Sequence, residues 1–181
     1  MLMSVAYAIA AIFLVCFVAY VASLVWRRGG ATNVWGSLAL GGGMLAAAFW
    51  MLAAMLLWVL ARPWTPDQPN LVRAMHDLTY LLGGPAHVVM LGLFVAAGAV
   101  SLPRDMGVPA ALRWVGLAGA AVSLLSVAAL LFDPASLVLP IGRGLTLLWI
   151  AGVGVTLAWN LRRARERVVS RPSPIAGSRA R

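Results

Sequence analysis

Five long apolar runs, separated only by short polar segments, constrain the fold of this chain more than any other feature. The runs cover about residues 5–26, 34–61, 71–102, 112–132 and 139–161. A helix needs about 20 apolar residues to cross a bilayer, and each run reaches that length. Because the runs are continuous rather than alternating, they predict helices and not strands. The sequence therefore predicts an all-α, polytopic membrane bundle of five transmembrane helices.

Composition excludes the other broad classes of protein. Of the 181 residues, 62% are hydrophobic and only 10% are charged, whereas a soluble domain is about half apolar and a quarter charged. A disordered chain needs low hydrophobicity, but the mean hydropathy here is +0.92. All 14 cationic side chains are arginines. This bias, with many Ala, Gly and Leu residues, is typical of a GC-rich bacterial genome and predicts a bacterial plasma membrane.

The arginines also predict the orientation, because cytoplasmic segments of membrane proteins carry an excess of positive charge. With the N-terminus outside and the C-terminus inside, eleven arginines lie inside and three lie outside. Seven of the eleven follow Asn160, in a basic tail (162–181) that we expect to be disordered beyond Val169. We expect this tail to contact anionic lipid headgroups rather than nucleic acid. The tail residues nearest the membrane are Arg162, Arg163, Arg165 and Arg167.

Small residues gather on three of the predicted spans. The second span carries Gly36, Gly41–Gly43 and Ala46–Ala48, and pairs of glycines recur in the fourth and fifth spans. Lipid gives helices no hydrophobic reason to associate, so close backbone approach has to stabilise the bundle. These residues therefore predict tight helix packing. The alternative is a pore or a groove that faces a ligand.

Residues 70–87 contain both histidines and the one aspartate that lie within the apolar runs, and two structures fit this segment. In the first, one helix runs from about Leu71 to Ser101 and is kinked at Pro85, because proline is tolerated in membrane helices. In the second, a surface helix ends at Gly83 and Gly84, and Pro85 begins the true span. We favour the continuous helix.

In a continuous helix, His76, Tyr80 and His87 share one face, because eleven residues make about three turns. Such a polar stripe would descend from the outer surface into the bundle, where polar groups are costly and often functional. The plainer alternative leaves His76 and Asp77 in water and gives His87 a hydrogen bond to a neighbouring helix.

Arg143 lies near the outer end of the fifth span, where an arginine is expensive and usually paired. Its expected partners are Asp77 and Asp133, which would tie the outer ends of three helices together. The functional alternative is a small outward-facing polar vestibule in which Arg143 attracts an anion or carboxylate above His87. The candidate ligand-binding residues are His76, Asp77, Tyr80, His87, Asp133 and Arg143.

The sequence carries no catalytic motif and no clear ligand set for a metal. On one helix His76 and His87 would be about 16 Å apart, too far to hold a haem between them. We therefore expect no cofactor, no metal and no enzymatic activity; an enzyme would need His87 beside an acidic group. The leading functional prediction is an accessory or interaction protein that binds a membrane partner or a second copy. The alternative is a carrier or sensor of a small ligand.

The sequence contains the segments Arg73–Leu78, Gly83–Val89, Pro109–Gly116 and Leu139–Arg143, together with Trp149. With these segments the chain resembles a group of small integral membrane proteins of actinobacteria to which no activity is assigned. The resemblance covers most of residues 27–160 and implies only a helical bundle in a bacterial membrane.

The proline-rich segment Arg62–Pro66 also resembles a loop of translocator-protein-like (tryptophan-rich sensory) proteins, which have five spans and many tryptophans. Here, however, the loop follows the second span rather than the first, and the later aromatic-rich pattern is missing. We therefore carry no porphyrin or sterol ligand over from that family.

Overall fold

The computed structural model describes residues 2–29, 33–62, 69–102, 107–130 and 137–169, and every regular element in these ranges is helical. The elements are α1 (Leu2–Gly29), α2 (Val34–Leu60), α3 (Pro69–Leu81), the π-helical turn η1 (Leu82–Ala86), α4 (His87–Ser101), α5 (Ala110–Leu125), the 3-10 turn η3 (Ser126–Leu130) and α6 (Val138–Val169). Five helices are long and apolar enough to cross a membrane, because α3, η1 and α4 form one helix and η3 extends α5. The predicted fold class is confirmed.

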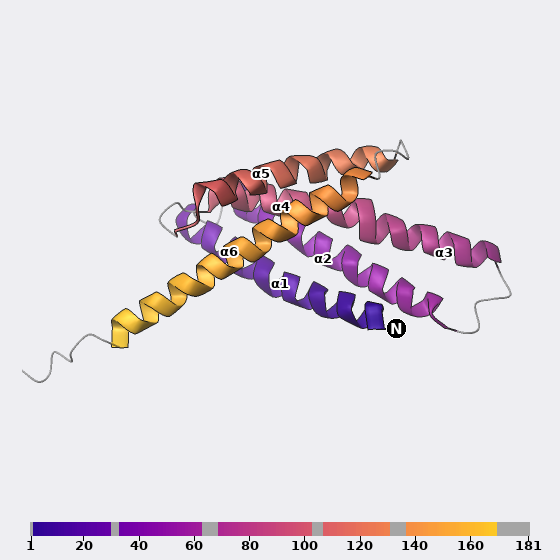
Figure 1. The fold of residues 1–181 in the computed structure, drawn as a ribbon, viewed down its shortest axis with the longest axis horizontal. Helices are drawn as coiled ribbons and strands as arrows, with labels where there is room; N and C mark the ends of the chain where they lie inside the picture. Colours follow the sequence, from indigo (N-terminus) through magenta and orange to yellow (C-terminus); the bar gives the residue numbers. More distant parts are fainter. Residues whose placement is uncertain (1, 30–32, 63–68, 103–106, 131–136, 170–181) are drawn as a thin grey trace, which may run out of the picture.

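The helices form a bundle in which neighbours along the chain lie side by side. The closest pairs are α1 with α2, α2 with α4, α4 with α5, and α5 with α6, while α4 also touches α1 and α6. Figure 1 shows the N-terminus and α3 at one end of the bundle and the start of α5 at the other. We call these the α3 end and the α5 end. The basic residues 162–169, predicted as the start of the tail, continue α6 as helix.

Glycines let the helices approach closely, as their positions in the sequence predict. A Cβ on Gly43 of α2 would lie 2.3 Å from a methyl carbon of Val18 on α1. Trp149 of α6 is fully buried because its indole fits against both Gly98 of α4 and Gly116 of α5, where an added Cβ would lie 2.5 and 2.4 Å from the ring. Gly43, Gly98 and Gly116 therefore pack within the chain, whereas Gly41 faces open space.

The helix from Pro69 to Ser101 is continuous, which confirms the favoured alternative, but it is not α-helical throughout. At η1 the backbone N–H of His87 donates to the carbonyls of Leu82 and Gly84 instead of to that of Gly83. Pro85 lies inside this turn, and its ring removes one donor from the helix. A π turn accommodates one additional residue, so it turns α4 by roughly 100° relative to a regular α-helix.

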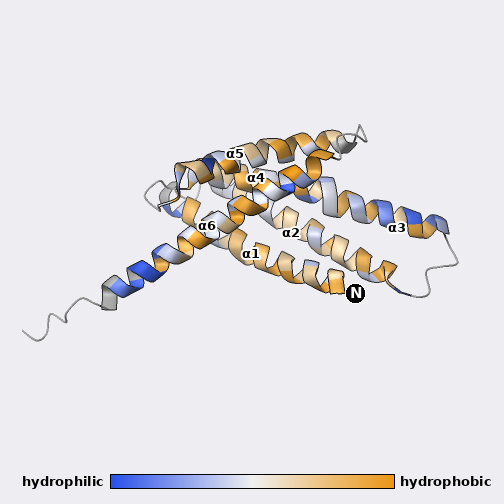
Figure 2. Cartoon of the chain, viewed as in Figure 1, coloured by the Kyte–Doolittle hydropathy of each residue, from blue (hydrophilic) through white to orange (hydrophobic). Residues whose placement is uncertain are grey.

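This helix is longer than a bilayer is thick. Its 33 residues span about 50 Å, whereas the hydrocarbon core of a membrane is about 30 Å. If Ser101 lies at one boundary of the core, the other boundary falls near η1, and α3 extends into the headgroup region and water. Figure 2 agrees, since hydrophilic residues gather on α3 and along the last turns of α6.

A chamber around Arg143 at the α3 end

A chamber of about 640 Å³ opens at the α3 end, between six elements of the bundle: α1, α2, α3, η1, α4 and α6. The volume lies within the range of small-molecule sites, about 300–1,000 Å³. Most of the wall is apolar, and a few polar side chains interrupt it. The lining residues are Tyr7, Ala53, Leu57, His76, Thr79, Tyr80, Gly83, Gly84, Val88, Leu139, Pro140, Arg143, Gly144 and Leu147.

Arg143 supplies the only positive charge on the described wall of this chamber. It lies five residues after the start of α6, and its guanidinium donates a hydrogen bond to the Gly83 carbonyl. The π turn makes that carbonyl available, because the His87 N–H bypasses it. The Arg143 Nε–H is buried and has no hydrogen-bond partner among the described residues. A guanidinium carries five N–H donors, so most of its binding capacity is unused.

The expected ion pair between Arg143 and Asp77 is not formed. Asp77 is exposed on α3 and does not line the chamber, and the guanidinium has no carboxylate partner in the described part of the chain. The other expected partner, Asp133, lies outside the described residues. Arg143 is instead held by a backbone carbonyl and lies 5.9 Å from the ring centre of Trp50 on α2.

His87 is fully buried and does not line the chamber, so the stripe predicted for His76, Tyr80 and His87 does not form. The extra residue in η1 explains the difference, because it turns His87 away from the face of His76 and toward α2. His87 Nδ1 lies 2.9 Å from the Ala46 carbonyl oxygen. A carbonyl oxygen only accepts, so Nδ1 carries the proton. This is the hydrogen bond to a neighbouring helix that the plainer alternative predicted.

The aromatic ring of Trp50 connects the buried histidine with the chamber. Its ring centre lies 4.6 Å from that of His87 and 5.6 Å from that of Tyr7. The indole Nε1 of Trp50 and the Nε2 of His87 are both buried without a hydrogen-bond partner among the described residues. The hydrogen-bond partner of His87 among the described residues is thus the Ala46 carbonyl alone.

His76 and Tyr80 line the chamber as predicted, but two further polar residues were missed. Thr79 donates to the Met75 carbonyl of its own helix, at 2.7 Å, and Tyr7 enters the wall from α1. Tyr7 could have been found by counting along the helices. In a five-helix bundle of alternating direction, the first and fifth spans start at the same end, so residues early in both spans lie at similar depth.

The predicted lipid-binding arginines lie at the opposite end. Arg162, Arg163 and Arg165 are exposed on α6, and Arg163 lies 5.2 Å from the ring centre of Trp159. The side chain of Arg167 lies outside the described residues, as do residues 170–181. Exposed cations beside an interfacial tryptophan are typical of a helix that leaves a bilayer.

No protein-family model, no curated protein and no solved structure matches this chain. The five apolar helices suggest a multi-pass membrane protein.

Proposed function

We propose that this chain is a non-enzymatic plasma-membrane protein that binds a small organic carboxylate at Arg143, as a carrier or sensor. One observation carries the proposal: a half-buried guanidinium lines an apolar chamber and has no carboxylate partner among the described residues. An arginine within a membrane span is costly and is usually paired. A bound anion would supply the missing counter-charge.

The chemistry of the wall favours one negative charge on an apolar body. A single cation balances a single anion, whereas a dianion would leave one charge unpaired in an apolar site, at a cost of several kcal/mol. A carboxylate can accept two hydrogen bonds from a guanidinium, and the Arg143 Nε–H is unused. Leu57, Leu139 and Leu147 offer contacts to the apolar body.

The packing of the small residues supports ligand binding over the accessory role. An interaction protein would present its small residues to a partner, but Gly36, Gly43 and Gly116 are each covered by a side chain of this chain, and only Gly41 of the glycines named on the second span is open. Binding of a membrane partner or a second copy stays a prediction.

The proposal can be tested by measuring binding of octanoate to the purified full chain in detergent, by calorimetry. Octanamide and octanol serve as neutral ligands of matched length. We expect octanoate to bind at least tenfold more tightly than either neutral ligand. We also expect Arg143→Gln to lose this preference and Arg73→Gln, which changes an exposed arginine of α3, to retain it. Equal affinities for octanoate and octanamide would contradict the proposal.

A second variant keeps the test independent of any effect of Arg143 on folding. Gly144 lines the chamber, and a Cβ there would have no described atom within 4 Å, so Gly144→Leu should fill the chamber without a clash. Gly41 is equally open but lies away from the chamber, which makes Gly41→Leu its matched control. We expect Gly144→Leu, and not Gly41→Leu, to abolish octanoate binding.

The orientation predicts that the chamber faces the exterior, and labelling can test it. In a Cys16→Ala background, Asp77→Cys at the α3 end should react with a membrane-impermeant maleimide added to intact cells. Arg165→Cys at the other end should react only after the cells are opened. The reverse pattern would place the chamber on the cytoplasmic side.

A further inference from the structure

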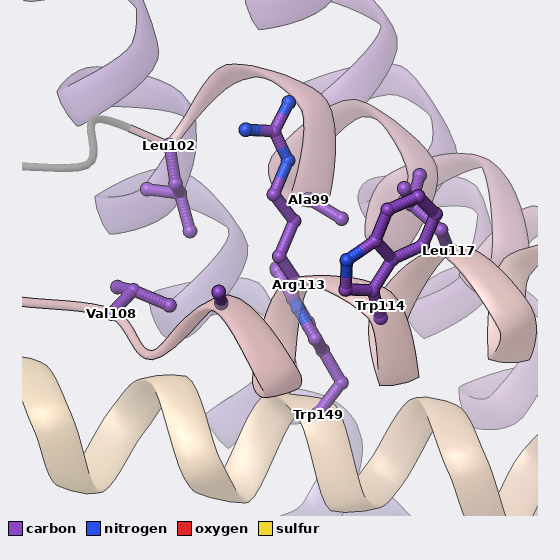
Figure 3. Close-up of a pocket in the computed structure, with 8 residues that line it drawn as sticks. Ala99, Leu102, Val108, Arg113, Trp114, Leu117 and Trp149 are labelled. Carbon is purple, nitrogen blue, oxygen red and sulfur yellow. The ribbon is translucent and has the colours of Figure 1, made fainter.

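A second cavity, of about 470 Å³, lies at the α5 end of the bundle, and on α6 its lining residue Trp149 follows Arg143 by six residues. It is a slot between the end of α4, the start of α5 and the middle of α6. Figure 3 shows the side chain of Arg113 at the slot, with the indole of Trp149 below it and that of Trp114 at its side. The lining residues are Ala99, Leu102, Val108, Ala110, Arg113, Trp114, Leu117 and Trp149.

The slot contains a buried donor that has no acceptor. Trp149 is fully buried, yet its indole Nε1–H has no hydrogen-bond partner in the described part of the chain. Buried polar groups in native proteins are nearly always hydrogen-bonded, so a donor of this kind is available to an acceptor other than the described residues. In a membrane, the ester carbonyls of glycerolipids are abundant neutral acceptors.

The slot also carries a positive charge at a strongly cationic end of the protein. Arg113 is half-buried, and its guanidinium donates a hydrogen bond to the Val100 carbonyl at 3.3 Å. This bond holds the guanidinium at the end of α4, and its other N–H groups can donate to a ligand. Arg27, Arg162 and Arg163 are exposed at the same end. Trp114 is 71% exposed, as expected for an indole at a lipid–water interface.

We propose that this slot is a specific site for an anionic phospholipid of the adjoining leaflet. One acyl chain lies among Leu102, Val108 and Leu117, the phosphate pairs with Arg113, and an ester carbonyl accepts from the Trp149 indole. The site needs neither Arg143 nor a soluble ligand, so it stands apart from the function proposed above. Charge selects the anionic lipid, and the indole selects an ester over an ether linkage.

The experiment places the full chain in nanodiscs of phosphatidylcholine with one fifth of the lipid replaced by the probe, and measures thermal stability. The probes are diester phosphatidylglycerol, its dialkyl ether analogue and soluble glycerol phosphate. We expect the diester lipid to raise the melting temperature by several degrees, the ether lipid by about half as much, and glycerol phosphate not at all. Native mass spectrometry should find one phosphatidylglycerol retained after mild delipidation.

Two matched pairs of variants locate the effect. Arg113→Gln should remove the preference for phosphatidylglycerol, and Arg27→Gln, an exposed arginine at the same end, should keep it. Ala110→Leu should block the slot, whereas its exposed neighbour Ala111 does not line the slot, so Ala111→Leu should not. Both alanines lie in the first turn of α5, so neither change buries a large side chain in the core.

The proposal is overturned if Arg113→Gln and Arg27→Gln reduce the lipid effect equally, because that would indicate general attraction to a cationic surface. Equal stabilisation by the diester and the ether lipid would remove the role given to Trp149. A full effect from glycerol phosphate would indicate a simple anion site.

Discussion

α3 and α4 belong to one continuous helix, yet α3 is mostly exposed and α4 is mostly buried. Thr79 is the one buried residue of α3, a segment that the structure describes in full, whereas nine of the fifteen residues of α4 are buried. Around α4, glycines bring the neighbouring helices into backbone contact. Around α3 and η1 the helices stand far enough apart to leave a chamber with a charged wall. The chain thus separates a half that stabilises the bundle from a half available to a ligand, and η1 is the boundary.

The largest expected effect is a loss of stability when a glycine at a close helix contact is replaced. A Cβ on Gly142 of α6 would lie 2.9 Å from Ser123 Oγ and 3.1 Å from Ser123 Cα on α5, and a backbone atom cannot move aside alone. We expect Gly142→Leu to lower the free energy of unfolding by about 3 kcal/mol or to prevent folding. SDS-driven unfolding of the purified protein measures this. Gly144→Leu, two residues further along the same helix, should change the free energy of unfolding by less than about 1 kcal/mol relative to wild type. Similar losses for both variants would remove the distinction between the two regions.

The next effect falls on binding rather than on the fold. Arg143→Met keeps an unbranched apolar stem but removes the guanidinium and its charge. We expect the affinity for octanoate to fall by about 10–100-fold, because a hydrogen bond to a charged group contributes about 1.5–3 kcal/mol. The free energy of unfolding should change by less than about 1 kcal/mol, because the lost bond to the Gly83 carbonyl is offset by removing a costly charge. A loss of stability as large as that of Gly142→Leu would make Arg143 a structural residue.

A smaller effect is expected at His87, where the two regions meet. His87→Leu removes the donor to the Ala46 carbonyl and should lower the free energy of unfolding by about 1 kcal/mol. Because His87 does not line the chamber, the octanoate affinity should stay within about twofold of wild type. Calorimetry on the variant tests this, and a tenfold weaker affinity would show that His87 forms the floor of the chamber after all.

The smallest effect is expected at Pro85. Pro85→Ala restores a backbone N–H, but a return to regular α-helix would turn the buried face of α4 away from its neighbours. We therefore expect the π turn to persist and the free energy of unfolding to change by less than about 0.5 kcal/mol. Hydrogen exchange along η1 reports whether the turn is kept. A variant that becomes regular α-helix and stays stable would show that the proline, and not the packing of α4, sets the turn.

Sequence patterns predicted the fold well because the signals were long and redundant. Each apolar run is longer than the stretch that a transmembrane helix needs. Glycines such as Gly43 and Gly116 predict close helix contacts from residue type alone. The end of the fifth span was less certain, because arginines beyond Leu161 are compatible with both helix and tail, and α6 in fact continues to Val169.

The site was harder to predict because it depends on single-residue geometry. His76, Tyr80 and Arg143 do come together, since each lies near the α3 end. Hydropathy does not reveal whether a helix widens by one residue, and that one residue decides where His87 faces. The same turn presents the Gly83 carbonyl to Arg143, so a carbonyl holds the arginine where the sequence suggested Asp77. Trp50 and Tyr7 belong to other helices, and only their relative depth could have pointed to them.

The wide turn also sets a rule for editing or aligning this protein. Removal of one residue between Leu82 and Ala86 would restore a regular α-helix. It would also rotate α4 about the helix axis by roughly 100° relative to α3. A related sequence that matches α4 could match α3 only after a shift of one residue. An alignment should therefore allow a one-residue gap within η1. The extra residue in η1 thus lets the sequences of α3 and α4 vary independently of each other.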